Sequence, residues 1–297
     1  MIKRIVDISE QAYLHLNKKQ LLVEKQGELV SSIPVEDLGV LILQHPAIVV
    51  TQAALIACQQ NNAVVVFCDQ RHLPYSVLLP ISEGNSLHTR VLREQTEVSA
   101  PVKKRLWKQI VQEKIRQQVA TLVSSGKDSQ RLRRMVEKVK SGDIENHEAQ
   151  SAQHYWRKLM GDHFRRNRNE PGINTLLNYG YAIIRAMIAR ALVGSGLHPA
   201  LGLHHRNQYN GLCLADDLME PFRPWVDQVV VQLSSETNQP DIDRNSKQAL
   251  LSLIGHPVEW NNKSMPLIIA SHHLAANLKS VMTGEGNKIL NFPQRAS

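Results

Sequence analysis

Two histidines and three carboxylates crowd into the segment LHHRNQYNGLCLADDLMEPFRPW, residues 203–225. The LADDLMEPF portion predicts a helix, which puts Asp217 and Glu220 one turn apart on one face and turns Asp216 about 100° away. Two like charges at this spacing repel unless a cation lies between them, and carboxylate oxygens suit Mg²⁺ or Mn²⁺. An acidic helix start that complements the helix dipole explains the lone motif equally well.

The adjacent histidines bear on this choice. The apolar run ends at His204 and His205, and a predicted loop over residues 206–211 would let one imidazole reach back to the acidic helix. An imidazole beside two carboxylates would favour tolerance of Mn²⁺, because nitrogen is a softer ligand than oxygen. A histidine in such a place is more often a core or capping residue.

A further carboxylate could come from the predicted helix IENHEAQSAQHYWRKLM, residues 144–160. Glu148 is the better candidate because neighbouring alanines indicate a packed side, whereas Glu145 lies nearer the helix end. A packed carboxylate needs a partner. A metal ion is one such partner, and Arg157 or Lys158 is an equal alternative.

The elements that would position these residues begin with a strand-rich region. Turn residues separate short β-like runs at residues 3–8, 12–16, 20–26, 28–34, 38–43, 64–68 and 75–79. One helix is predicted over residues 51–62, with Thr51 as its N-cap. This region has no obvious catalytic set, which leaves it free for assembly.

The hydrophobic period changes from 2 to about 3.6 after residues 82–90, which predicts helices. The first helix has an apolar face (Leu106, Ile110, Ile115, Val119, Leu122) and a basic outer side (Lys103, Lys104, Lys108, Lys114, Arg116). Further helices are predicted at 129–140, 145–160, 173–194, 212–233, 246–254 and 265–283. We therefore expect an α+β protein: a β-rich domain over residues 1–85, a larger all-helical catalytic and DNA-binding domain over 86–285, and a loose tail over 286–297.

Positive charge is concentrated in the middle of the chain. Residues 90–190 hold 21 Lys and Arg against 10 Asp and Glu, a local excess of +11, whereas the whole 297-residue chain has a net charge of +8. This distribution is typical of a protein that binds a polyanion. A basic face that only solubilises the helices is the alternative. The arginine-rich pieces RLRR (131–134) and HFRRNR (163–168) favour phosphate, because guanidinium forks match phosphate oxygens.

Several function classes are disfavoured. Neither a G-x-x-x-x-G-K-[ST] nor a G-x-G-x-x-G run is present, so we expect no nucleotide cofactor. The three cysteines (Cys58, Cys68, Cys213) form no C-x-x-C pair, which argues against a disulfide framework or a cysteine zinc site. The first twenty residues mix charges into every apolar run, so we expect neither a signal peptide nor a membrane span, and a cytoplasmic protein (nuclear in a eukaryote).

Three motifs together resemble the CRISPR-associated adaptation integrase family, Cas protein number one. They are ENHEAQSAQHYW, INTLLNYGYAIIR (173–185) and GLHPALGLHHRNQYNGLCLADDLMEPFRPWVD (196–227), and DLMEPFRP is most like the type II version. The family also begins with a β-rich domain followed by a helical one, so the resemblance covers the whole chain. It implies a metal-dependent DNA endonuclease and integrase that inserts new spacers into a CRISPR array by 3′-hydroxyl transesterification.

The resemblance also implies a set of functional residues. Glu148, His205 and Glu220 match the family's catalytic and metal-binding positions, with Mg²⁺ or Mn²⁺ as the metal, and Asp217 matches an additional acidic position that supports the site. Counting back to Pro199 and Gly202 favours His205 over His204. Arg90, Arg157, Arg165 and Arg223 are the candidates for phosphate contacts.

The family's partners complete the expectation. They are double-stranded and branched DNA (prespacer and CRISPR repeat), a second copy of the chain in a homodimer, the second CRISPR adaptation protein in a larger complex, and other type II adaptation proteins and the effector nuclease. Two other functions stay open from the residues alone: a non-catalytic basic DNA-binding scaffold, and a different metal-dependent nuclease that acts on RNA.

Overall fold

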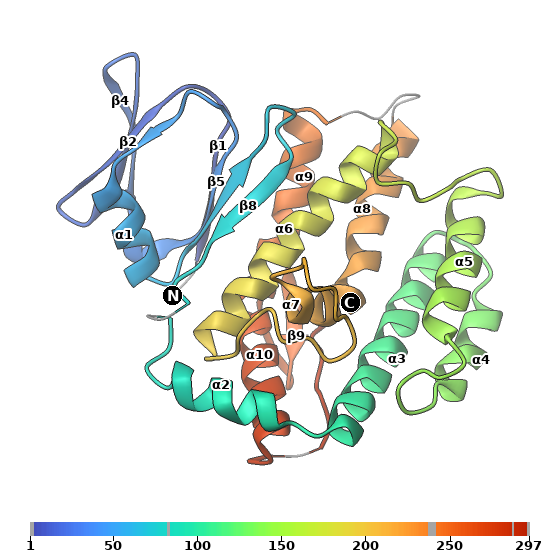
Figure 1. Ribbon diagram of the computed structural model, residues 1–297. Helices are drawn as coiled ribbons and strands as arrows, with labels where there is room; N and C mark the ends of the chain where they lie inside the picture. Colours follow the sequence, from blue (N-terminus) through green and yellow to red (C-terminus); the bar gives the residue numbers. More distant parts are fainter. Residues whose placement is uncertain (1–2, 82–83, 237–241, 287, 296–297) are drawn as a thin grey trace.

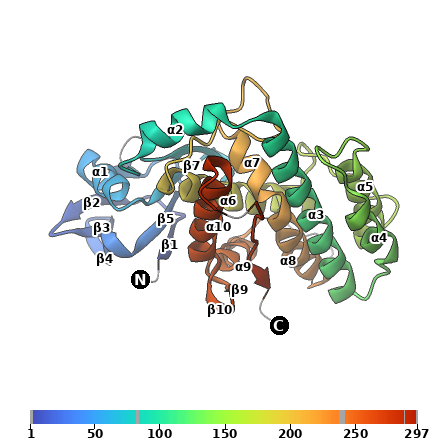
Figure 2. The same cartoon turned by 90° about the horizontal axis from the view of Figure 1, so that it is seen from below.

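A computed structural model shows a strand-rich unit joined to a larger helical unit (Figure 1), which confirms the α+β class. It describes residues 3–81, 84–236, 242–286 and 288–295. The strand-rich unit lies at one end of the molecule and the helices α3 (Ala100–Ser124), α4 (Gln130–Lys138) and α5 (His147–Met160) lie at the other. The helices α6 (Ile173–Gly194) and α10 (Leu267–Thr283) run between them (Figure 2).

The strand-rich unit contains two four-stranded sheets. One has the order β1-β5-β7-β8, formed by Arg4–Ile8, Leu38–Leu43, Val64–Cys68 and Pro74–Leu78. The other has the order β4-β3-β2-β6, formed by Glu28–Pro34, Gln20–Lys25, Tyr13–Asn17 and Val49–Val50. Each predicted strand is therefore present, and the short β6 was not predicted. The predicted helix is α1 (Gln52–Gln60), and the Thr51 hydroxyl accepts a hydrogen bond from Ala54 N at its start.

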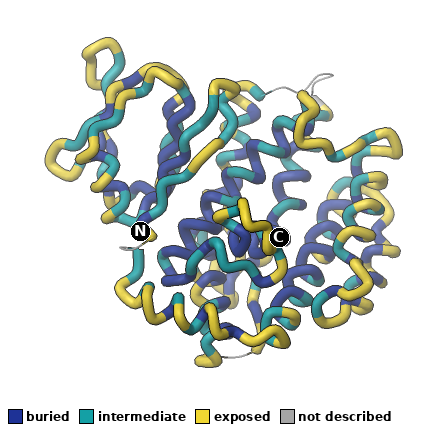
Figure 3. The backbone as a smooth tube through the Cα atoms, in the orientation of Figure 1, coloured by how far each residue is buried: buried dark blue, intermediate teal, exposed yellow. Residues whose placement is uncertain are grey.

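Strand β5 separates two hydrophobic cores. All six of its residues are buried. Val40 and Ile42 belong to the core of the helical unit, whereas Leu41 and Leu43 belong to a smaller core with α1 and the second sheet. Because successive side chains of a strand point to opposite faces, one strand fills both cores. The buried stretches accordingly run from the sheet into the helices (Figure 3).

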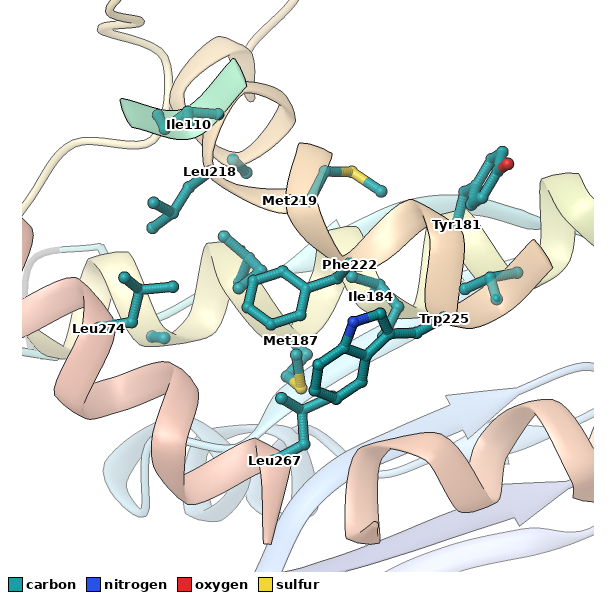
Figure 4. Close-up of a cluster of buried hydrophobic side chains, with 14 of the residues drawn as sticks. Ile110, Tyr181, Ile184, Met187, Leu218, Met219, Phe222, Trp225, Leu267 and Leu274 are labelled. Atoms are coloured by element: carbon teal, nitrogen blue, oxygen red, sulfur yellow. The ribbon is translucent and has the colours of Figure 1, made fainter. Parts of the chain in front are cut away.

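The helical unit is built around α6, most of which is buried. Against it pack α7 (Cys213–Met219), α8 (Arg223–Glu236), α9 (Arg244–Gly255) and α10, and α2 (His88–Glu97) packs on α10. A one-turn 3-10 helix, η2 (Glu220–Phe222), joins α7 to α8. Phe222 and Trp225 point into the apolar cluster between α6 and α10, beside Ile184, Met187 and Leu267 (Figure 4).

Helix α6 is also long and apolar enough to cross a membrane, by length and composition only. Of its most apolar window, 83% is buried inside the protein. A core helix passes the same test, and the packing of α6 against four other helices accounts for its composition.

The expectation of an all-helical second domain is wrong. Strands β9 (Pro257–Trp260), β10 (Lys263–Pro266) and β11 (Gln294–Arg295) form a small antiparallel sheet. Strand β11 lies in the segment expected to be a loose tail, and there the Arg295 guanidinium donates to Thr121 Oγ1 at 3.0 Å. Short strands that depend on contacts distant in sequence leave little periodic signal.

The helix predicted over 212–233 is divided into α7, η2 and α8. Pro221 lies inside η2, and proline lacks the backbone N–H that a continuous α-helix would use. The break comes after Glu220, whose backbone N–H still bonds to Asp217 O, so helical geometry continues from Asp217 to Glu220.

We predict that Gly180→Ala lowers the free energy of unfolding by about 1–3 kcal/mol, because a methyl group there overpacks the α6–α8 contact. A Cβ at Gly180 would overlap Val226 Cγ1 and lie 3.1 Å from Leu250 Cδ2. Urea denaturation measures the change. Gly255→Ala is the matched control, since nothing lies within 4 Å of its Cβ position. Equal stability of the two variants would contradict this packing.

Candidate functional site

A buried lysine connects two of the three acids predicted to form the site. Lys114 on α3 places Nζ 2.7 Å from Oε1 of Glu148 on α5 and 2.6 Å from Oε2 of Glu220 in η2. Lys114 is only 7% exposed and Glu220 only 4%. The sequence predicted Lys114 on the basic outer side of its helix, and this is wrong. Lys114 is instead one turn beyond the buried Ile110, on the inner face.

The start of α5 positions Glu148. The Asp143 carboxylate accepts hydrogen bonds from His147 N and Glu148 N, both at 2.9 Å. It therefore caps two of the free N–H groups at the helix start. Arg157 and Lys158, the alternative partners predicted for Glu148, lie in the last turn of α5, and Arg157 pairs with Asp162 at 3.0 Å. Glu148 is paired with Lys114 instead.

Helix α3 also holds the segment that carries Glu220. Trp225 Nε1 donates to Gln117 Oε1 at 2.8 Å, and the Thr121 hydroxyl donates to Pro224 O at 3.0 Å. Gln117 and Thr121 follow Lys114 along α3 and are buried like it. One face of α3 thus both pairs with the Glu220 carboxylate and forms hydrogen bonds to the residues that follow it.

The charges around Glu220 keep it ionised. Burial alone would raise the pKa of Glu220, but Arg223, whose Nε lies 2.8 Å from Oε1, and Lys114 outweigh it and lower the pKa to about 2. Burial would likewise lower the pKa of Lys114, and the two glutamates raise it instead. Buried charges of this kind are stable only when each has a partner.

Asp217 holds the histidine segment in place. Its Oδ2 accepts from Leu203 N at 2.6 Å and from His204 N at 3.1 Å, and its Oδ1 accepts from His205 N at 3.2 Å. Oδ1 also lies 2.7 Å from His205 Nδ1. Asp217 is fully buried and contacts Nδ1 of the His205 ring. Nε2 is therefore the ring nitrogen available to a ligand.

The close approach of this segment to Asp217 requires a glycine. A Cβ on Gly202 would overlap His205 O and lie 3.0 Å from Asp217 Oδ2. Trp107 on α3 completes the support, because its ring stacks on His204 at 4.2 Å between centroids and meets His205 edge-on at 5.9 Å. His204 is thus a packing residue in this arrangement, and Asp216 pairs with Arg185 at 2.6 Å.

The donor set fits a hard divalent cation, although it is not gathered around one point. Within the described ranges, no group of three His, Cys, Asp or Glu side chains could hold a metal as it stands. The pKa of His205 is raised by its Asp217 hydrogen bond and further by Glu220 and Glu148, so the imidazole lies in the field of both acids. Glu220 Oε2 is buried and is paired with a cation, the Lys114 ammonium 2.6 Å away. An oxygen in this state can accept a metal ion.

An arginine-lined pocket of about 420 Å³ lies beside the acids. Arg166, Arg168, Arg185 and Arg223 line it. The Arg223 guanidinium lies 4.7 Å from the centroid of the Tyr181 ring and Arg166 lies 5.3 Å from it. Asp216 also lines the pocket and pairs with Arg185, and Arg223 connects the pocket to Glu220.

The four arginines predicted to contact phosphate lie in different places. Arg223 adjoins the acids as described above. Arg157 and Arg165 both bond to Asp162 beyond the end of α5, at its carboxylate and its carbonyl oxygen, respectively. Arg90 on α2 pairs with Glu94 at 2.8 Å and Glu285 at 3.5 Å. The structure therefore gathers only Arg223 at the candidate site.

Sequence reasoning missed the residues that position the acids. Lys114 and Trp107 stand seven residues apart, a helical spacing that places them on one face, but a lysine is normally assigned to the surface. Asp143 lies five residues before Glu148 and has the residue type of a helix cap. Arg166 and Arg168 fall in the HFRRNR piece that indicated phosphate binding, without being singled out.

The chain has similarities to several known proteins. Residues 6–254 match the family model for CRISPR associated protein Cas1. A CRISPR-associated endonuclease Cas1 of Neisseria meningitidis serogroup C (strain 8013) is 33% identical over 297 residues, covering 99% of this chain and 97% of that protein. A casposase bound to integration product superposes with a TM-score of 0.78 at 19% identity, over 96% of this chain and 92% of that one. A chain of a Cas6-RT-Cas1–Cas2 complex superposes with a TM-score of 0.75 at 16% identity, over 95% of this chain and 35% of that one. The two structures show likeness of fold.

The buried Asp227, which accepts a hydrogen bond from the pocket residue Tyr181, supports a pH prediction. Tyr155 and Tyr181 donate hydrogen bonds to its buried carboxylate. Burial raises the pKa of Asp227 to about 7 against the opposing effect of these bonds. In the unfolded chain the group ionises near pH 4, so the folded state holds an extra proton between about pH 4 and 7. Its contribution to the free energy of unfolding therefore falls as pH rises, by up to about 1.4 kcal/mol per pH unit.

Asp227→Asn removes this titration. We expect the variant's free energy of unfolding to decline less steeply than that of the wild type between pH 4 and 7, as measured by chemical denaturation at each pH. Asp162→Asn, at an exposed position, is the control and should keep the wild-type slope. Parallel curves for Asp227→Asn and the wild type would contradict a raised pKa at Asp227.

Proposed function

Because the chain belongs to the CRISPR-associated protein Cas1 family of endonucleases, we propose that it inserts new spacers into a CRISPR array by metal-dependent transesterification. The observation that supports the proposal is that Glu148 and Glu220 converge on one ammonium group, with His205 in their field and Arg223 linking Glu220 to an arginine-lined pocket. This arrangement combines negative charge for a metal ion with positive charge for a phosphate backbone.

Glu148, Glu220 and His205 are proposed to hold Mg²⁺ or Mn²⁺. Each comes from a different element, α5, η2 and the segment before α7, which gives a set of two carboxylates and one imidazole. Asp217 holds the His205 ring rather than binding the metal, because both its oxygens are occupied by the histidine segment. When bound, such an ion polarises a phosphoryl oxygen and favours ionisation of the attacking hydroxyl.

The remaining residues orient the DNA. Arg166, Arg168 and Arg185 would pair with phosphates on the pocket side, while Arg223 keeps Glu220 ionised and faces the same pocket. In the reaction, a 3′-hydroxyl oxygen forms a bond to phosphorus and the bond to the leaving 3′-oxygen breaks. The incoming hydroxyl loses a proton and the leaving oxygen gains one. One phosphodiester replaces another, so no nucleotide cofactor is required.

The proposed partners follow from the same family. We propose a homodimer through the β-rich unit, where the apolar Tyr13, Leu29, Val30 and Val49 are exposed. A structural neighbour of this chain belongs to a complex that contains Cas2, so a second adaptation protein is proposed to bridge two such dimers. The other proposed partners are prespacer and repeat DNA, other type II adaptation proteins and the effector nuclease. The proposed location is the cytoplasm.

We predict that Glu148→Gln, His205→Ala and Glu220→Gln each lower Mn²⁺-dependent strand transfer about 100-fold or more, because each removes a metal ligand. A gel assay with branched, repeat-bearing DNA and the second adaptation protein measures the rate. Binding of the DNA should change much less. Glu145→Gln is the control, since Glu145 is exposed and pairs with Lys140.

Full activity in all three variants would refute this site. If the wild type binds DNA with a steep salt dependence but shows no metal-stimulated chemistry on any DNA structure, the protein is a binding scaffold. If it cleaves RNA in preference to DNA in a substrate panel, it is a nuclease of the other class.

We further predict that Arg168→Ala reduces the slope of log K for DNA binding against log salt by about 1, because one phosphate contact is lost. Fluorescence anisotropy between low and physiological salt measures the slope. Arg71→Ala removes the same charge from the strand-rich unit, where the side chain is 80% exposed, and should leave the slope unchanged. The same slope for wild type and Arg168→Ala would exclude the pocket from the DNA contact.

A further inference from the structure

The Lys114 ammonium stands where a metal ion between Glu148 and Glu220 would stand. Its nitrogen lies 2.7 Å from one carboxylate and 2.6 Å from the other, and the two acids come from separate elements. These glutamates are two of the three ligands proposed above. A cation of the protein itself therefore occupies the space between them.

The other charges of the cluster are arranged differently. Arg223 contacts Glu220 through Oε1, on the oxygen that Lys114 does not touch. Arg223 thus pairs with one acid, whereas Lys114 bridges both. The Lys114 ammonium is thus shared between a buried oxygen of Glu220 and an oxygen of Glu148.

We infer that Lys114 is a resident counter-ion that holds the two glutamates together in the metal-free protein and is displaced when the metal binds. This inference rests on the proposed metal site. Without a cation between them the two carboxylates would repel each other, and the buried Glu220 would have no compensation for its lost solvation. The ammonium removes that repulsion, and the divalent ion must then compete with it for the same position.

The residue type suits this role. A lysine has one compact charge at the end of a flexible four-carbon stem, so its ammonium can leave the carboxylates while the helix stays in place. An arginine would engage carboxylates through a planar fork and would be harder to displace. Lys114 is therefore a positioning residue that also sets the affinity of the site for metal.

The test is Mn²⁺ binding by the full chain without DNA, followed through the electron paramagnetic resonance signal of free Mn²⁺. Lys114→Met keeps most of the side chain's volume and removes its charge, and we expect Mn²⁺ to bind at least about tenfold more tightly because nothing must be displaced. Lys114→Arg should bind Mn²⁺ more weakly than the wild type. Metal-free Lys114→Met should also unfold at a lower temperature and recover more stability on addition of Mn²⁺ than the wild type does.

Two controls separate displacement from a general change of charge. Lys108→Met removes the same charge from the same helix, outside the cluster, and should not alter the affinity. Arg223→Met removes a charge that contacts Glu220 but does not bridge the acids, so its effect should be smaller than that of Lys114→Met. An effect of Arg223→Met equal to or larger than that of Lys114→Met would overturn the inference.

A measurement on the wild type covers the case in which Lys114→Met does not fold. Amine acylation followed by mass spectrometry should show Lys114 protected without metal and labelled faster at saturating Mn²⁺. Continued protection, together with wild-type affinity in Lys114→Arg, would overturn the inference. If Glu148→Gln and Glu220→Gln bind Mn²⁺ as the wild type does, the proposed metal site itself fails, which is a distinct result.

Discussion

The ion triplet of Lys114, Glu148 and Glu220 is the electrostatic constraint on the relative positions of α3, α5 and η2. Lys114 and Glu220 are taken out of water where α3, α5 and η2 meet, while Glu148 is partly exposed. The two buried charges are tolerable only while their partners stay within ion-pair distance. The three elements must therefore keep their relative positions. The cap from Asp143, the hydrogen bond that Gln117 accepts from Trp225 and the one that Thr121 donates to Pro224 serve this requirement, because they fix the segments that carry the acids.

The apolar framework behind the triplet is shared between both units. Strand β5 contributes alternate side chains to two cores, and Phe222 and Trp225 anchor the acidic segment in the larger of them. Polar links cross the same junction: buried Arg190 on α6 donates to Asn62 O of the strand-rich unit and contacts His272 on α10. Burial and the charge of Arg190 lower the pKa of His272 to about 3, so the imidazole is uncharged at neutral pH. The acidic segment and the strand-rich unit thus contribute to one apolar core.

Sequence reasoning reached the elements more completely than their contacts. Periodicity and turn residues predicted the strands and most helices, because these patterns are local. Grouping Glu148, His205 and Glu220 in one site relied on family resemblance, and their roles as ligands remain a prediction. Lys114 could not be placed correctly, since a lysine on a basic helix is ordinarily exposed and only the distant acids make its burial favourable. The short strand β11 likewise depends on its pairing with β9, and no local sequence pattern predicts that pairing.

Trp107 gives this arrangement an optical property. Its indole stacks on His204 and meets His205 edge-on, and a protonated imidazole quenches the emission of an adjacent indole. The ring contacts the same segment that Asp217 holds, so movement or deprotonation of His205 is expected to change the fluorescence of Trp107. Of the four tryptophans in the chain, Trp107 is the one stacked on this histidine segment, and the protein contains its own fluorescent probe of the site without an added label.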